Sequence, residues 1–403
     1  MITKRVLAAV VSLMATVVGA TAQEPLAMGE AFTIESRVMA EQRRVIVWTP
    51  PGYAAGKSAY PVLYLTDADR QFGHTVTTVE FLSRNGRMPP MIVVGIFNTD
   101  RTRDLTPYKD SDADQQLPTA GGGDRFLRFI ETELVPWVEG RYRTEKFRAF
   151  AGHSFGGLFA LHALATRPEL FDAVIAVSST LAWRQGEAAK RIDTMLPQQR
   201  ILKCALYVTL GDEGQALKAG LERLRTVLEE KAGQSLRWDL VEMLDEDHGS
   251  IVLRSHYAAL EQIFDGWRLP HPHTGTFTGG WKAVDAHYAR LSDRLGWHIT
   301  PPEPTVNALG HAALGERKVD EALQLLEANV RNYPDSPNAY DSLGEALEAA
   351  GRLDDAMAKY EEAVRRGEAV KDPLLDAFRA HRDAVRKTLA ETKRPLTSST
   401  PPR

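Results

Sequence analysis

The stretch Phe150-Ala151-Gly152-His153-Ser154-Phe155-Gly156-Gly157-Leu158-Phe159-Ala160 contains the pattern Gly-x-Ser-x-Gly at Gly152, Ser154 and Gly156. In this pattern a strand turns sharply into a helix, and the serine lies on the turn in strained backbone geometry. The flanking glycines have no Cβ, which leaves room for the turn. Residues 146–151 resemble a short strand and residues 157–166 an apolar helix. The sequence therefore predicts an exposed nucleophilic serine; the alternative is a tight turn with an idle serine.

A serine hydroxyl is a poor nucleophile until a base takes its proton. When a Gly-x-Ser-x-Gly turn is part of a catalytic triad, the chain order is serine, then acid, then histidine. His248 lies in Asp245-Glu246-Asp247-His248-Gly249-Ser250, directly after the last predicted strand. We expect His248 to be the base, while His153, His162 and His256 are interpreted as packing or solvent-contact residues.

The acid is expected after the strand that contains Leu206 to Leu210, where Asp212 and Glu213 stand side by side. Neighbouring residues at the end of a strand point to different sides, so only one of them can face the imidazole. We predict Glu213, with Asp212 as the competing candidate. Asp245 or Asp247 could take its place, or the site could work as a serine–histidine dyad.

Two backbone amides are expected to hold the oxyanion that forms on the substrate. The amide of Phe155, at the start of the helix, is one donor. The second should come from the loop after the third strand, Asp67-Ala68-Asp69-Arg70, and we assign it to Asp69.

Apolar runs alternate with helical patterns along the first two thirds of the chain. Such alternation predicts an α/β fold with a mostly parallel sheet. The predicted strands are 32–39, 43–49, 61–67, 91–97, 146–151, 171–178, 205–210 and 236–244, and the predicted helices are 75–84, 126–140, 157–166, 216–232 and 255–267. Residues 100–123 are polar and rich in Gly, Asp and Pro, so they are predicted to form a long loop.

The first residues have the pattern of a secretory signal peptide. Lys4 and Arg5 precede an apolar run from Val6 to Val18, and Ala20-Thr21-Ala22 is a small-residue cleavage site. We expect cleavage after Ala22 and a periplasmic or secreted protein, with no membrane attachment after cleavage. The net charge of −4 and the lack of a domain-scale basic face argue against nucleic-acid binding.

An internal repeat follows a linker and a connecting helix near the C-terminus. Val306, Leu309, Gly310 and Ala322 recur 34 residues later as Tyr340, Leu343, Gly344 and Ala356. This is the tetratricopeptide period, with small residues where paired helices approach closely. Two such units are expected to pack on the helix that starts at Trp281 or on the one at 374–389, and they offer a surface for a protein partner. The predicted divisions are signal peptide 1–22, an α/β domain with the serine motif 23–268, linker and connecting helix 269–302, repeats 303–370, and a helix with a disordered tail 371–403.

The chain resembles the putative-esterase branch of α/β hydrolases, which contains the enterochelin-esterase-like enzymes. The resemblance covers residues 32–267, and its motifs are Val62-Leu63-Tyr64-Leu65-Thr66-Asp67, Arg101-Thr-Arg103-Asp104-Leu-Thr-Pro107, Gly152-His-Ser-Phe-Gly-Gly157, Leu210-Gly-Asp-Glu213 and Asp247-His-Gly-Ser-Ile251. It implies that Ser154 is the nucleophile, His248 the base and Glu213 the acid. The third-strand loop departs from the common Leu-Asp-Gly form by reading Thr-Asp-Ala.

The resemblance implies an α/β-hydrolase fold and an exported serine esterase that acts on a small-molecule ester without metal or organic cofactor. Relatives include siderophore trilactone, acetyl and feruloyl esterases and acyltransferases, so the substrate stays open. An acyltransferase on the same site, or a non-catalytic binding protein that docks a partner through its repeats, are the alternatives. Arg101, Arg103 and Asp104 are interpreted as a structural ion-pair cluster, and recognition of an anionic substrate is the second interpretation.

Overall fold

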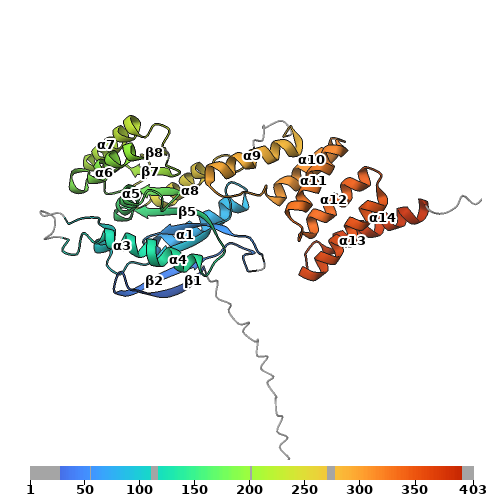
Figure 1. The fold of residues 1–403 in the computed structure, drawn as a ribbon, viewed down its shortest axis with the longest axis horizontal. Helices are drawn as coiled ribbons and strands as arrows, with labels where there is room; N and C mark the ends of the chain where they lie inside the picture. The colour runs from blue at the N-terminus through green and yellow to red at the C-terminus, as the bar shows by residue number, and fades with distance from the viewer. Residues whose placement is uncertain (1–27, 55, 110–116, 200–201, 270–276, 393–403) are drawn as a thin grey trace, which may run out of the picture.

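The computed structural model describes residues 28–54, 56–109, 117–199, 202–269 and 277–392 (Figure 1). The predicted signal peptide, most of the linker at 270–276 and the predicted disordered tail from Lys393 lie outside the described residues. Within the described residues, none of the helices combines the length and apolar character that crossing a bilayer requires.

An eight-stranded sheet forms the centre of the larger region, in the order β1-β2-β4-β3-β5-β6-β7-β8. β1 and β2 are antiparallel to their neighbours, and every pairing from β4 to β8 is parallel. This arrangement confirms the predicted mostly parallel sheet. The strands are β1 (Glu30–Ser36), β2 (Glu41–Trp48), β3 (Tyr60–Leu65), β4 (Ile92–Ile96), β5 (Thr144–His153), β6 (Ala173–Val177), β7 (Ala205–Gly211) and β8 (Arg237–Met243).

Helices cover both faces of the sheet, which is why β3, β4, β6 and β7 are almost entirely apolar. Two cores result, one on each face. One face is covered by α3 (Gly123–Phe129), the π-helical turn η1 (Ile130–Leu134), α4 (Val135–Glu139), α5 (Phe155–Thr166), α6 (Glu187–Met195) and α7 (Gln215–Lys231), and the other by α1 (Ala68–Arg84) and α8 (Ile251–Ile263). Short 3-10 turns η2 (Trp183–Gln185) and η3 (Leu196–Gln198) flank α6.

The smaller region consists of helices only and extends away from the sheet (Figure 1). Its helices are α9 (Gly280–Leu295), α10 (Glu303–Gly315), α11 (Val319–Asn332), α12 (Pro337–Ala349), α13 (Leu353–Val370) and α14 (Leu375–Thr392). Its core continues that of the α1 and α8 face, because Trp297 packs on Phe147 with ring centroids 5.1 Å apart. α9 packs against α11 and α14 against α13, so the repeats use both predicted flanking helices.

The structure corrects several sequence predictions. The predicted loop at 100–123 contains the short helix α2 (Arg101–Leu105), whose first turn is capped because the Asp100 side chain accepts a hydrogen bond from the Arg103 amide at 3.0 Å. α6 was not predicted, and α1 and α8 begin earlier than the apolar periodicity indicates. Cys204 lies directly before β7 and is buried.

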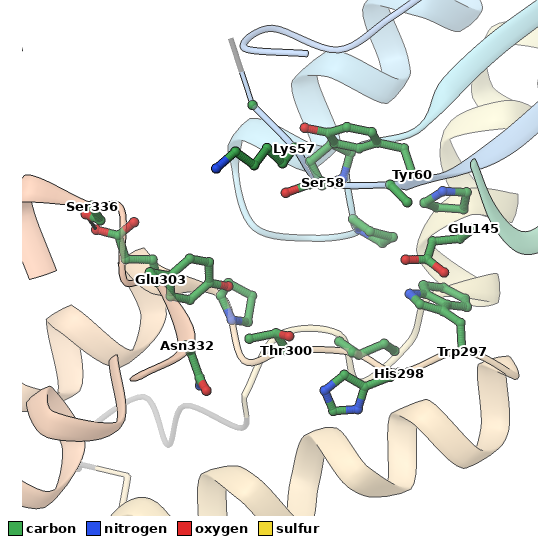
Figure 2. Close-up of a pocket in the computed structure, with 18 of the residues that line it drawn as sticks. Lys57, Ser58, Tyr60, Glu145, Trp297, His298, Thr300, Glu303, Asn332 and Ser336 are labelled. Atoms are coloured by element: carbon green, nitrogen blue, oxygen red, sulfur yellow. Dashed lines mark hydrogen bonds between the residues drawn. The ribbon is translucent and has the colours of Figure 1, made fainter. Parts of the chain in front are cut away.

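A cavity of about 1110 Å³ separates the two regions. Figure 2 shows Lys57, Tyr60 and Glu145 on the hydrolase side, facing Trp297, Glu303 and other residues of the helical region. Glu145 lies near the amino end of β5, whereas Ser154 follows its carboxyl end. At the rise of an extended strand these two positions are roughly 30 Å apart. The cavity is therefore distinct from the serine site.

Candidate active site

Ser154 lies between β5 and α5 with φ 61° and ψ −115°, a strained conformation for a residue with a Cβ. Its amide donates to the carbonyl of Val177 on β6 at 2.9 Å. A Cβ on Gly152 would lie 2.1 Å from the carbonyl oxygen of Gly156, so only glycine fits there. The residue pattern thus produces the predicted strained turn, with Ser154 at the carboxyl end of the parallel strands.

Glu213 and His248 meet at the ends of neighbouring segments. Glu213 Oε2 lies 2.5 Å from His248 Nδ1. Its other oxygen accepts hydrogen bonds from the Ser178 hydroxyl and, at 3.3 Å, from the amide of Gly211. The Glu213 side chain is 7% exposed and that of His248 is 47% exposed. A buried carboxylate therefore orients a solvent-accessible imidazole, with Nε2 as the nitrogen left to face a substrate.

Asp212 points away from this pair, as the alternation of side chains along a strand requires. Its carboxylate is 66% exposed and forms an ion pair with Lys218 at 2.8 Å. Asp245 pairs with Arg254 at 2.5 Å, and Asp247 accepts from the amides of Gly249 and Ser250 at 2.8 Å. Of the four candidate carboxylates, Glu213 is the one with a hydrogen bond to His248.

His153 connects the serine turn to the His248 loop. Its Nε2 lies 2.6 Å from the carbonyl oxygen of His248, and because a carbonyl only accepts, this nitrogen carries the proton. The two rings have centroids 4.6 Å apart. Burial, together with the nearby His248, lowers the pKa of His153 below its ordinary value. The sequence analysis interpreted His153 as a packing residue and did not predict this contact. The contact holds the loop of His248 next to the serine turn.

The loop after β3 approaches the serine turn from the other side. Asp67 has φ 54°, and its buried carboxylate accepts hydrogen bonds at 2.6 Å from Arg101 Nε and from Asn98 Nδ2. Arg101 also donates to the carbonyl of His153 at 3.2 Å. A Cβ on Gly156 would lie 2.5 Å from Thr66 Oγ1, which shows how closely the loop and the turn approach.

Phe155 and Asp69 are each in the first turn of their helix, α5 and α1. Amides in a first turn have no acceptor within the helix, so they can donate to a ligand. The two helices begin at the adjoining loop and turn, which is the arrangement expected of two oxyanion donors. Their assignment to that role stays a prediction.

The Arg–Asp motif that follows β4 divides between two roles. Arg103 pairs with Glu41 and Asp104, and Asp104 pairs with the buried Arg43 at 2.6 Å. These contacts hold α2 against β2 and agree with the structural interpretation. Arg101, by contrast, supports the serine turn directly through Asp67 and the carbonyl of His153.

Sequence reasoning missed Ser178 as a part of the site, and it named Arg101 without predicting its contact with the serine turn. Ser178 follows β6, the strand beside the serine strand, has φ 41° and is fully buried. Its position at the carboxyl end of a neighbouring parallel strand could have indicated that it lies at the site. His162 and His256 lie elsewhere as expected: His162 contacts Tyr108 at 2.9 Å, and His256 contacts Thr75 at 2.9 Å.

Two aromatic side chains and one cationic side chain, those of Phe155, Trp183 and Arg184, form a wall beside the serine turn. The amide of Thr180 donates to the carbonyl of Ser154 at 3.4 Å, which places the segment leading to Trp183 and Arg184 beside the turn. Trp183 packs edge to face on Phe155, with ring centroids 5.5 Å apart. The guanidinium of Arg184 lies over the Tyr108 ring.

Comparisons with known proteins agree with this geometry. A family model described as a putative esterase matches residues 36–234, and a tetratricopeptide repeat model matches residues 307–370. The chain is 31% identical to the ferri-bacillibactin esterase BesA of Bacillus subtilis over 259 residues, which are 55% of this chain and 87% of BesA. It is 30% identical to a siderophore enterobactin esterase of Emericella nidulans over 254 residues, 51% of this chain and 82% of the relative.

Among solved structures, an IroE-like serine hydrolase from Shewanella oneidensis has a TM-score of 0.67 and 27% sequence identity. The match covers 75% of this chain and 99% of that protein. The sequence relatives thus place the chain in the esterase family, and the structural neighbour shares its fold.

Proposed function

Because this chain belongs to the putative-esterase family of α/β hydrolases and is a carboxylic ester hydrolase, we propose that it cleaves its ester through an acyl-enzyme on Ser154. His248 takes the hydroxyl proton as Ser154 Oγ attacks the ester carbonyl carbon, and then gives that proton to the departing alcohol. In the second half of the reaction water attacks the acyl carbon and His248 accepts its proton; the bond to Ser154 Oγ then breaks, the acid leaves, and His248 returns the proton to Ser154 Oγ. Glu213 stabilises the imidazolium in both halves. The observation that supports this role is the 2.5 Å contact of buried Glu213 with His248 Nδ1.

The amides of Phe155 and Asp69 are the proposed oxyanion donors. Amides aimed at the position of the developing charge stabilise it without reorganising during the reaction. The Arg101–Asp67 ion pair keeps the loop that contains Asp69 against the turn that contains Ser154.

The decisive experiment replaces the nucleophile. Ser154→Ala should lower kcat for a chromogenic ester on the order of a million-fold, the size seen when a triad serine is removed, while the melting temperature stays nearly constant. Ser83→Ala, which changes a serine on α1 without touching the site, is the matched control. Activity above a few per cent in the Ser154 variant would contradict the mechanism. A fluorophosphonate probe should label the wild type and the control but not Ser154→Ala.

For the substrate we propose an ester-linked siderophore. Both curated relatives are named as siderophore esterases, and the wall of Phe155, Trp183 and Arg184 offers rings for stacking and a cation for an anionic ring substituent. The test compares kcat/KM for a ferric catecholate trilactone with that for p-nitrophenyl acetate. Trp183→Ala should reduce the first value at least about tenfold more than the second; an equal reduction would contradict this substrate class.

Hydrolysis is proposed in preference to acyl transfer, because both relatives are named as esterases. Product analysis in the presence of an added alcohol distinguishes the two reactions, since a transferase would form the new ester in place of free acid.

We also propose that the protein acts after export, on the basis of the signal-peptide pattern at its N-terminus. N-terminal sequencing of protein from the periplasm or the medium should begin at Gln23. A fully active protein found only in the cytoplasm with Met1 retained would contradict export.

A further inference from the structure

Three helices of the repeat region bring histidines and carboxylates together. Asp341 and Glu345 are one helical turn apart on α12, His381 is on α14 and His311 is on α10. Asp341, Glu345 and His381 each offer a ligand atom, and these atoms all lie within 4.8 Å of one another. The two regions of the chain are joined through α9, so this cluster lies well away from the serine site (Figure 1).

The distances in this cluster are close to those between ligands of one metal ion. His381 Nδ1 lies 3.0 Å from Asp341 Oδ2 and 3.9 Å from Glu345 Oε1. Zinc binds imidazole nitrogen and carboxylate oxygen at about 2.0–2.2 Å in a tetrahedron, which separates two ligand atoms by about 3.3 Å. The three ligand atoms already lie within 4.8 Å of one another, so changes of side-chain rotamer are enough to bring them to the separation that one ion requires.

The charge around the cluster also favours a cation. A simple ion pair needs one carboxylate for His381, but Glu345 is a second carboxylate on the same face of α12. The arginines nearest to His381 in the sequence are occupied elsewhere, Arg382 by Asp383 and Arg379 by Glu368. Asp341 is only 7% exposed, so water screens its charge poorly.

His311 supports the second carboxylate from outside. Its Nδ1 lies 3.5 Å from Glu345 Oε2, the oxygen that does not face His381, and its Nε2 lies 3.1 Å from Ser342 Oγ. Carboxylates that bind a metal are themselves oriented by such outer hydrogen bonds.

We propose that Asp341, Glu345 and His381 form a divalent transition-metal site, for which Zn²⁺ is the best-matched ion. One imidazole nitrogen and two carboxylate oxygens fill three positions of a tetrahedron, and water fills the fourth. The site joins α12 to α14. Phe378 and Val385 are the buried side chains of α14, with Leu375 and Leu389 partly buried beside them, so a bound ion would add a link between helices to this apolar packing.

The experiment uses the full mature chain without a histidine tag, stripped of metal with a chelator and then dialysed. Zinc is titrated by calorimetry, and Co²⁺ is titrated as a spectroscopic probe, because tetrahedral Co²⁺ absorbs visible light much more strongly than octahedral Co²⁺. Glu345→Gln and His381→Gln remove one ligand each. Glu348→Gln, the same substitution one turn further along α12, is the matched control.

We expect one zinc per chain in the wild type and in Glu348→Gln. Each ligand variant should bind zinc at least about tenfold more weakly, because removing even a residue that only hydrogen-bonds to a metal ligand lowers metal affinity about tenfold or more. Each should also lose the intense Co²⁺ bands. Circular dichroism shows whether each variant is folded. Zinc binding that is equal in all four proteins, or absent from the wild type, would overturn the proposal.

Discussion

The hydrolase region and the helical region both depend on glycine, but for different physical reasons. In the serine turn, a Cβ on Gly152 would meet the backbone oxygen of Gly156 at 2.1 Å. In the repeats, a Cβ on Gly344 would meet the end of the Tyr360 ring at 2.6 Å. The Tyr360 ring is a side chain that can shift with its helix, whereas a carbonyl held in a strained turn cannot move. In the hydrolase region the glycine is therefore required for the backbone shape of the site, and in the helical region it is required for close packing of two helices.

The strongest test of the site concerns the neighbouring residues Glu213 and Asp212. Glu213→Gln should lower kcat by roughly a hundredfold to ten-thousandfold, as the loss of a triad acid does. Asp212→Asn should change kcat less than about twofold, since Asp212 is exposed and paired with Lys218. Both are measured on one chromogenic ester. If Asp212→Asn is the more damaging, the acid is misassigned; if neither variant matters, the enzyme is a Ser154–His248 dyad.

The comparison of glycines can be tested by introducing a single methyl group into each region. Gly152→Ala should abolish esterase activity, because the turn cannot close around the new Cβ. Gly344→Ala should keep its activity and lose about 1–3 kcal/mol of unfolding free energy, the usual cost of overpacking a core. Activity assays and urea unfolding measure the two effects. Substantial activity in Gly152→Ala, or a loss of activity in a folded Gly344→Ala, would break the distinction.

A third test uses pH, because the hydrolase region buries histidines. Burial lowers the pKa of His256 to about 3, and His74 beside it is also lowered. The neutral imidazole is thus preferred in the folded state. The contribution of the neutral His256 to the free energy of unfolding is fully present above the ordinary pKa of about 6.5, and it is lost as pH falls from 6.5 toward 3. Each pH unit costs up to about 1.4 kcal/mol.

Urea midpoints at several pH values between 7 and 5 measure this loss. His256→Gln should flatten the pH dependence of stability, because it removes the proton uptake on unfolding while keeping a side chain that can bond to Thr75. The exposed His298→Gln is the control and should keep the wild-type slope. If stability changes with pH equally in the wild type, His256→Gln and His298→Gln, His256 is not the group that takes up the proton on unfolding.

The smallest effect is expected at the contact between the regions. Lys57 and Asp335 form an ion pair at 3.3 Å across the cavity, with side chains 90% and 76% exposed. Exposed pairs of this kind contribute little. Lys57→Ala should leave both the melting temperature and the esterase activity unchanged within error. A clear fall in melting temperature would show that the two regions depend on this contact.

Features that depend on neighbouring residues were predictable from the sequence. The strained turn follows from the local Gly-x-Ser-x-Gly spacing, and the buried strands follow from continuous apolar runs. Side-chain alternation predicted that only one of Glu213 and Asp212 faces the imidazole, and in the structure Glu213 contacts His248 while Asp212 pairs with Lys218.

Features that depend on distant segments were not predictable. Asp67 and Arg101 are 34 positions apart, and Ser178 and Glu213 are 35 apart; no local pattern announces such contacts. α6 was missed because the chain enters it through Arg184 and Gln185, both in left-handed conformations that propensity reasoning does not assign to non-glycine residues. α2 was missed because its five residues are too few to show periodicity.

Cys204 gives the protein a practical property. It is the only cysteine in the chain and is 5% exposed, and burial raises the pKa of its thiol. Thiol reagents attack exposed thiolates, so the native chain should react only slowly with maleimides. A cysteine introduced at Lys57 or Asp335 would be its one fast-reacting thiol. A dye attached there would report on movement between the two regions while the serine, at the other end of β5, stays free to turn over substrate.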